Sequence, residues 1–303
     1  RVGTFQYIAA RQNIEDLKTL VDYTIERHYP QIKSSKTKAL DLLNLVMEKQ
    51  CQLVVDWMRV GFIHGVMNTD NMTISGETID YGPCAFMDQY HPKTVFSSID
   101  KLGRYAYSNQ PPITKWNLTR FAECLIPLID KNEDTAIKIA TDVIDNFQNI
   151  YEKKWLNMMR DKLGLFGEDK NDRKLIDDLL NWMEKNKIDY TNIFCHLMDI
   201  KIDNNTYKDK TFLTWFDEWK KRSQLNNSSK EKQIKLMKKN NPIVVPRNHK
   251  VEEALTEANN GSLEGMNKLN DILKNPYSNQ EDIAEYQVPA PTTNEKYQTF
   301  CGT

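Results

Sequence analysis

The chain has 303 residues, of which 40% are apolar and 10% aromatic, so it can bury one large core or two ordinary ones. Lys and Arg number 41 against 42 Asp and Glu, a balance that argues against a general nucleic-acid binder. No apolar run approaches the roughly 20 residues that a membrane span needs. The five Cys are scattered without a CxxC pair, which indicates neither a zinc site nor a disulfide framework and favours a reducing, intracellular setting.

Residues 1–60 predict helices in three pieces. Apolar side chains recur every three or four positions from Leu17 to Ile25, and again from Ala39 to Met58. This spacing places them on one face of a helix, whereas a strand would alternate them every second position.

Residues 61–90 differ in composition, because four Gly and Pro83 fall within a short stretch. Short apolar pieces at 72–74 and 78–79 flank Ser75 and Gly76, which predicts two short strands joined by a turn. Turn residues concentrated inside a helical chain are typical of a binding region.

Helical spacing resumes after this region. Residues 137–158 carry apolar or aromatic side chains every three or four positions, which predicts one core-facing helix. Two further helices are expected at 175–183 and 193–200. The aromatic stripe within 211–222 predicts another helix whose rings lie in the core.

Charge segregates near the end of the chain. Residues 218–250 hold ten Lys and Arg against two Glu, and residues 251–303 hold nine acidic residues against three Lys. The basic stretch suits a docking surface for an acidic partner or phosphate, or a solvated helix that pairs with the acidic tail, and we favour the second. Residues 289–303 predict an irregular tail.

A polar run between residues 64 and 82 contains the candidate catalytic and metal-binding residues. It reads His64-Gly-Val-Met-Asn-Thr-Asp70-Asn71, and Asp80-Tyr-Gly follows. Kinase-type enzymes use an Asn and the Asp of an Asp-x-Gly turn to hold Mg²⁺ against nucleotide phosphates, and a carboxylate to accept the nucleophile's proton. Mg²⁺ takes hard oxygen ligands, one or two of them from the protein. Asn71 and Asp80 fit that pair.

The kinase pattern fails at one position. Kinase catalytic loops run His-x-Asp-x-x-x-x-Asn. Counted from His64, this template places Asn71 on the metal-binding Asn but Val66 on the catalytic Asp. Because valine cannot accept a proton, the carboxylate must come from Asp70, beside Asn71. A displaced base is consistent with a nucleotide that lies differently in its cleft.

The full string resembles the selenoprotein O family, and the resemblance extends over essentially the whole chain. It rests on the run at 64–72 and on 78–83. Further matching blocks are Arg1-Val2-Gly3-Thr4-Phe5-Gln6, Ala10-Arg11, Gly103-Arg104-Tyr105, Asn109-Gln110-Pro111, Trp116-Asn117-Leu118, Asn241-Pro242, Arg247-Asn248, Asn275-Pro276-Tyr277 and Cys301.

The resemblance implies a pseudokinase that binds ATP in a flipped orientation and transfers AMP to Ser, Thr or Tyr hydroxyls of proteins, a protein adenylyltransferase. It implies Asp70 as the base, and Asn71 and Asp80 as ligands of Mg²⁺, with Mn²⁺ as an alternative. Asp80 would also face the nucleotide, and Arg1 would contact its phosphates. The expected partners are ATP and protein substrates, with no nucleic acid and no membrane, and we expect a monomer.

We therefore expect a mainly α (α+β) fold. Residues 1–130 would form a protein-kinase-like C-lobe with a short β-turn catalytic segment, residues 131–288 a large helical extension, and residues 289–303 an irregular tail with a terminal Cys. The family's N-lobe would precede Arg1, so the chain is expected to be a C-terminal portion that lacks this lobe.

Two other functions stay open. One is a catalytically inactive helical scaffold that only binds partners, and the other is a small-molecule kinase, which Val66 disfavours. The expected location is the bacterial cytoplasm, with mitochondria as the alternative.

Several single residues carry expectations of their own. His64 should brace the loop, and Arg104 is suited equally to pairing with phosphate or to bracing the catalytic loop through a carboxylate. Cys84 should be a small buried hydrophobe and Asp88 a surface or turn acid. Cys301 should be an accessible, oxidisable thiol. The resemblance implies a redox link from Cys301 to the catalytic domain, and an incidental surface thiol is the alternative.

Overall fold

The computed structural model describes residues 1–198, 205–225, 228–291 and 297–300. These residues are mainly helical, as the sequence predicts. The helices are α1 (Val2–Ala9), α2 (Ile14–His28), α3 (Lys38–Val60), α4 (Gln110–Ile129), α5 (Glu133–Asp145), α6 (Phe147–Lys162), α7 (Asp172–Asn186), α8 (Asn192–Leu197), α9 (Lys210–Gln224), α10 (Lys230–Asn240), α11 (Asn248–Asn259), α12 (Glu264–Leu273) and α13 (Ala284–Gln287). The strands are β1 (Phe62–Ile63) and β2 (Ala85–Phe86).

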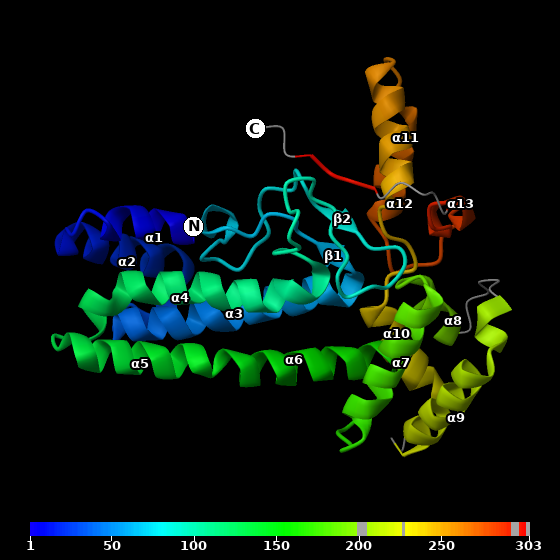
Figure 1. Cartoon of the computed structure of the whole chain (residues 1–303), viewed down its shortest axis with the longest axis horizontal. Coiled ribbons are helices and arrows are strands. Elements are labelled where there is room, and N and C mark those ends of the chain that lie inside the picture. Colours follow the sequence, from blue (N-terminus) through cyan, green and yellow to red (C-terminus); the bar gives the residue numbers. More distant parts are fainter. Residues whose placement is uncertain (199–204, 226–227, 292–296, 301–303) are drawn as a thin grey trace.

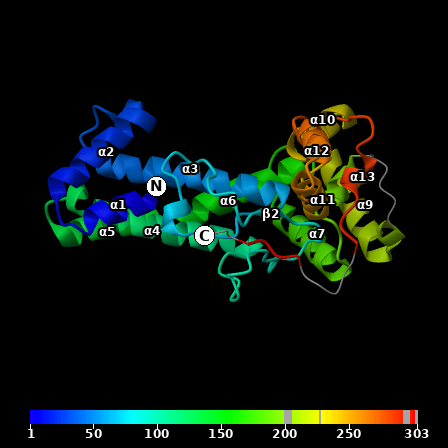
Figure 2. The same ribbon diagram turned by 90° about the horizontal axis from the view of Figure 1, so that it is seen from above.

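Long helices set the main axis of the molecule. α3, α4 and the consecutive pair α5 and α6 run along this axis, with the loops of residues 61–109 lying above α3 and α4 (Figure 1). Seen from above, α1 and α2 lie at one end and α7 to α13 gather at the other (Figure 2). Among the described residues, no helix combines the length and the apolar content that crossing a bilayer requires.

Helix α3 joins two hydrophobic clusters. Its first half contributes Leu42, Leu43 and Met47 to a cluster built with α1, α2, α4 and α5. Its last turns contribute Val55 and Met58 to a second cluster built with α6 to α13. The predicted helices within residues 1–60 are confirmed, while the domain boundaries drawn from the sequence stay predictions.

Helix α3 ends at a residue that can take the left-handed conformation. Gly61 has φ +73°, and its N–H bonds back to the Met58 carbonyl. A Cβ at this position would lie 3.0 Å from the Tyr190 ring, so glycine suits both the turn and the packing. The chain then enters β1 and the loop that carries the candidate chemistry.

The predicted strands at 72–74 and 78–79 are wrong. The two-stranded sheet lies outside them, where Phe62 of β1 pairs antiparallel with Phe86 of β2. The backbone at 72–74 is bound by side chains instead of a partner strand. Gln50 Nε2 donates to the Thr73 carbonyl at 2.5 Å, and the Tyr29 hydroxyl donates to the Ile74 carbonyl at 2.5 Å.

The predicted single helix at 137–158 is two helices. α5 ends and α6 begins on either side of Asn146, whose φ of −72° and ψ of −10° stay close to helical values. The apolar spacing therefore continues through the break, and spacing alone does not reveal it. Ile137 also departs from the expectation of a core-facing stripe, since 45% of it is exposed.

The aromatic stripe in α9 is confirmed as core. Phe212, Trp215 and Trp219 are buried, and the two tryptophan rings stack with centroids 6.2 Å apart. Each indole N–H reaches a backbone carbonyl, because Trp215 donates to Leu175 at 2.8 Å and Trp219 to Leu163 at 2.9 Å. Buried indoles with satisfied donors stabilise the packing of α9 against the rest of the cluster.

Among the described residues, Lys250 joins the basic stretch to the acidic end through two ion pairs. Lys250 Nζ lies 3.7 Å from a Glu285 carboxylate oxygen and 2.7 Å from Glu253. The lysines of α10 are mostly exposed. The favoured interpretation is a solvated helix that pairs with the acidic tail. The lysines of α10 are indeed solvated, and the pairing with the acidic end is made by Lys250.

Asp88 is not a surface acid. Arg247, which is 1% exposed, donates to Asp88 at 2.6 Å and to Asp189 at 2.7 Å. The Asp88 side chain is 18% exposed. The prediction fails because the partner is 159 positions away in sequence, where no local pattern can indicate it.

Candidate active site

The loop between β1 and β2 begins at a buried histidine. His64 Nε2 lies 2.8 Å from the Ile79 carbonyl, and its Nδ1 accepts the Val66 N–H at 3.4 Å. Its ring is fully buried beside Trp57. Burial lowers the pKa of His64, so the ring is neutral and donates through Nε2. The expected bracing role is seen, since His64 ties the start of the loop to the residue before Asp80.

Two predicted metal ligands lie side by side. Asn71 Nδ2 donates to Asp80 Oδ2 at 2.6 Å, across nine positions of sequence. The same amide nitrogen donates to the Val66 carbonyl at 3.0 Å. Asn68 accepts the Asn71 backbone N–H at 3.1 Å and so caps the short 3₁₀ helix η2 (Thr69–Asn71). These bonds fix Asn71 and point its side chain at Asp80.

Asp80 itself stands in a special conformation. Its φ of +59° is left-handed, a region in which Asp is tolerated better than most residues. This turn directs the exposed carboxylate of Asp80 toward Asn71 rather than along the chain. The metal role of both residues remains a prediction.

The proposed base rests on the first helix. Asp70 is exposed in η2, and the Val2 N–H donates to the Met72 carbonyl at 2.9 Å, which docks α1 on this loop. A Cβ added to Gly3 would lie 2.1 Å from Asp70 Oδ1, so the carboxylate sits directly against the glycine. Arg1 is exposed immediately before α1 and therefore lies at the edge of the same loop.

Val66 is buried, with 9% of it exposed. The position that carries the catalytic Asp in kinases therefore faces the interior of this loop. No proton acceptor at that position would reach solvent, whereas Asp70 does.

The sequence reasoning missed three residues that position the loop, namely Gly3, Gln110 and Asn117. Buried Gln110 accepts the His64 N–H at 3.0 Å and donates to the Phe62 carbonyl at 3.0 Å. Buried Asn117 donates to the Met67 carbonyl at 2.8 Å. Both amides come from α4 and hold the loop backbone from below. Their only sequence signal is their place in blocks that match the family, because an amide on a helix predicts no partner by itself.

Arg104 stacks on aromatic rings. Its guanidinium lies 4.9 Å from the Trp116 ring centre and 5.8 Å from that of Tyr105. Within the described part of the chain it makes no ion pair with a carboxylate, so a brace of that kind is not found there. The phosphate role stays a prediction.

The chain after Asp80 is held by the C-terminal segment. The Thr299 hydroxyl donates to the Pro83 carbonyl at 2.6 Å, and Thr299 pairs with Ser97 in a parallel bridge. Residues 297–300 are thus more ordered than the predicted irregular tail. Cys84 is half-buried, and burial raises the pKa of its thiol to about 11. Cys301 lies outside the described residues.

The donor set suits magnesium better than a soft metal. No group of three or more His, Cys, Asp or Glu side chains gathers at a metal-binding distance in the described ranges. Asn71 and Asp80 offer amide and carboxylate oxygens, the hard ligands that Mg²⁺ prefers, and phosphates and water would complete the shell. The residues present therefore fit a metal that is held jointly with a nucleotide.

Comparison with known proteins identifies the class. Residues 1–274 match the family described as "Protein adenylyltransferase SelO". The chain therefore belongs to the SelO family, which confirms the resemblance seen in the sequence motifs.

Individual relatives agree with this assignment. A "Protein nucleotidyltransferase YdiU" of Pelagibacter ubique (strain HTCC1062) is 66% identical over 304 residues, which cover 100% of this chain and 63% of the relative. Proteins of the same name from Bacillus cereus (strain AH820) and Bacillus mycoides (strain KBAB4) are 53% and 52% identical over 305 residues and are covered to 62%. The chain spans somewhat less than two thirds of the length of these relatives.

Proposed function

We propose that the chain belongs to an enzyme that transfers AMP from ATP to Ser, Thr or Tyr hydroxyls of proteins with the help of Mg²⁺. The observation that carries this proposal is the direct contact of Asn71 with Asp80 beside the exposed carboxylate of Asp70. The names of the relatives, protein nucleotidyltransferases, support the same reaction class. Because these relatives are bacterial, we place the protein in a bacterial cytoplasm.

Asp70 acts as the general base in this proposal. It accepts the proton of the substrate hydroxyl as the hydroxyl oxygen attacks the α-phosphorus. A new P–O bond forms, the bond from the α-phosphorus to the bridging oxygen breaks, and pyrophosphate leaves. A positioned base contributes about 10²- to 10⁴-fold to such a step. Asp70 is suited to it because it is exposed on a loop that Gly3, Gln110 and Asn117 hold in place.

Asn71 and Asp80 hold the metal. The Val66 carbonyl accepts from Asn71 Nδ2, which leaves the Asn71 carbonyl oxygen available as a ligand next to the Asp80 carboxylate. When bound, Mg²⁺ neutralises the charge that builds on the pyrophosphate leaving group. Arg1, at the edge of the loop, adds positive charge toward the phosphates.

The test uses a full-length protein in which this chain is joined to the part of the P. ubique relative that it does not cover. We expect this protein to incorporate label from α-labelled ATP into protein and not from γ-labelled ATP. Asp80→Ala should abolish the signal, because the metal loses its charged ligand. Asp70→Ala should lower it by about 10²-fold or more.

Asp217→Ala is the matched control. Asp217 is exposed on α9, far from the loop in sequence, and its loss should leave labelling unchanged. Incorporation of the γ-label would make the enzyme a conventional kinase. Near-normal turnover of Asp80→Ala would refute the metal assignment.

A further inference from the structure

A cavity lies apart from the candidate active site. It is enclosed by the end of α3, by α6 and α7, and by the segment around η3 (Tyr107–Asn109), and its volume is about 260 Å³. A cavity of about 150 Å³ suffices for benzene, so this one has room for roughly ten non-hydrogen atoms. Asp70, Asn71 and Asp80 are not among its lining residues. The cavity therefore needs an explanation of its own.

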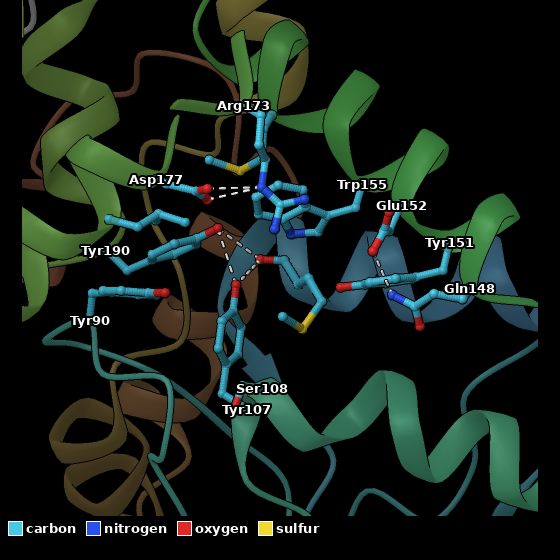
Figure 3. Close-up of a pocket in the computed structure, with 13 residues that line it drawn as sticks. Tyr90, Tyr107, Ser108, Gln148, Tyr151, Glu152, Trp155, Arg173, Asp177 and Tyr190 are labelled. Carbon is cyan, nitrogen blue, oxygen red and sulfur yellow. Dashed lines mark hydrogen bonds and ion pairs between the residues drawn. The ribbon is translucent and has the colours of Figure 1, made fainter. Parts of the chain in front are cut away.

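Two tyrosines on its wall offer lone pairs rather than protons. The Tyr107 and Tyr190 hydroxyls lie 2.7 Å and 2.9 Å from the Met58 carbonyl, to which both donate, and Figure 3 shows both oxygens at the centre of the cavity. The two hydroxyls also lie 3.3 Å from each other, within hydrogen-bonding distance. Because each has one proton, which the Met58 carbonyl or the other hydroxyl accepts, the lone pairs that remain can only accept further hydrogen bonds. A ligand that fills this space should bring donors.

Two more tyrosine hydroxyls point into the same space. Tyr90 is 9% exposed, and its hydroxyl is aimed toward the centre of the cavity from one side while that of Tyr151 is aimed from the other (Figure 3). Neither oxygen has a hydrogen-bond partner in the described residues. Neither hydroxyl belongs to the buried polar atoms that lack a partner, so each is open to water or to a ligand that enters the cavity.

The rim of the cavity carries net negative charge. Arg173 Nε bonds Asp177 at 2.9 Å and its guanidinium stacks on Trp155, so these two charges compensate each other. Glu152 remains, and its partner is the neutral Gln148 amide at 2.8 Å. Five aromatic rings line the cavity, and the faces of such rings attract cations.

The charges that act on Tyr90 are negative, like the net charge of the rim. Burial first, and then the negative charges of Glu184 and Asp177, raise the pKa of Tyr90 to about 12. The charges that act on the Tyr90 hydroxyl are thus negative, whereas Arg173 acts on Tyr151 and Arg59 on Tyr190 with the opposite sign.

We propose that this cavity binds a primary ammonium group on a short aliphatic stem. The ammonium brings three N–H donors. These match the acceptor oxygens of Tyr107 and Tyr190 and the carboxylate of Glu152, while the stem lies against aromatic and methionine side chains. A carboxylate or phosphate ligand would meet lone pairs and net negative charge. A free small amine and the side chain of a lysine on another protein share this chemistry, and the proposal does not depend on the proposed function.

Calorimetry on the full chain tests the proposal with n-butylammonium chloride as the probe. Binding with a dissociation constant of about 1 mM or lower is expected. The isosteric n-butanol and the anion butyrate should bind at least about tenfold more weakly. Nα-acetyl-lysine N-methylamide separates the two sources. If it binds as well as the probe, the site takes a lysine side chain, and if it does not bind, the site takes a free amine.

Variants tie the binding to the cavity. Glu152→Gln should weaken n-butylammonium about tenfold, because it removes the one uncompensated charge. Tyr90→Phe should weaken it about threefold, since it deletes a hydroxyl and keeps the ring. Glu218→Gln, an exposed change on α9 outside the cavity, is the matched control and should bind normally. Unchanged affinity in Glu152→Gln, equal binding of butyrate, or no binding of n-butylammonium at about 10 mM would overturn the proposal.

Discussion

Replacing Gly3 by alanine is a sharp test of the role of Asp70. The added Cβ would lie 2.1 Å from Asp70 Oδ1 and 3.1 Å from its Cγ. Real Cβ atoms essentially never come closer than 3.0 Å to another heavy atom, so the contact with Oδ1 is too short. The contact is with the far end of a side chain, so Asp70 can rotate away while the backbone stays. The substitution thus moves the carboxylate by about 1 Å without touching the metal ligands.

The expected cost follows from that displacement. Misplacing a reacting group by about 1 Å costs about 10²-fold in rate, or about 2.7 kcal/mol of transition-state stabilisation. Stability should change by less than about 1 kcal/mol, because Ala favours a helix over Gly by about that amount and the strain offsets part of it. We therefore expect kcat to fall about 100-fold while KM for ATP stays nearly constant.

The assay is AMP transfer by the same joined, full-length protein, with thermal unfolding measured in parallel. Gly265→Ala is a matched control, because Gly265 is also the second residue of its helix and its Cβ would lie 2.3 Å from a Glu257 carboxylate oxygen. That variant should lose no activity. In the Asp70→Ala background, Gly3→Ala should have no further effect, since no carboxylate remains to be displaced. Additive losses, or a Gly3→Ala enzyme with normal kcat, would refute the reasoning.

Three other outcomes are expected. The 303-residue chain alone should bind ATP weakly, because it spans less than two thirds of the length of its relatives. Calorimetry that gives a micromolar dissociation constant would contradict this. Arg247→Met should lower the free energy of unfolding in urea by about 3–5 kcal/mol, since it leaves Asp88 and Asp189 buried without a counter-charge. Lys174→Met, in an exposed pair, should change little by comparison. Burial lowers the pKa of His64, so the unfolded chain takes up the proton first and stability falls as the pH drops below about 6.5. His64→Asn should flatten this decline in pH-dependent melts, and an unchanged slope would show that His64 does not cause it.

The sequence was a good guide to helices and a poor one to strands. Helices are local, so the spacing of Leu17 to Ile25 is enough to place α2. Each strand has two residues, and Phe62 finds its partner at Phe86 across the whole loop. No local pattern of alternation can develop over two residues, which is why the turn-rich stretch at 72–79 was the more persuasive candidate.

Local contacts of the candidate site could be predicted from the sequence, and contacts that depend on the packing of helices could not. The kinase template predicted that Asn71, counted from His64, and Asp80, in an Asp-x-Gly turn, would hold one metal, and their side chains do touch. It could not predict Gly3 against Asp70, since that contact depends on how α1 docks. It missed the amide of Gln110 for the same reason, because a buried amide is informative only once its partner carbonyl is known.

Residues far along the chain support the candidate site. The segment that follows Asp80 is fixed by three contacts from the C-terminal half, through Thr299 on the Pro83 carbonyl, Asn248 on the Phe86 carbonyl and Arg247 on Asp88. These bonds set the path of the chain that follows Asp80. The positions that hold the site are therefore spread far beyond the loop itself. The family match, which continues to residue 274, includes Arg247 and Asn248 and ends before Thr299.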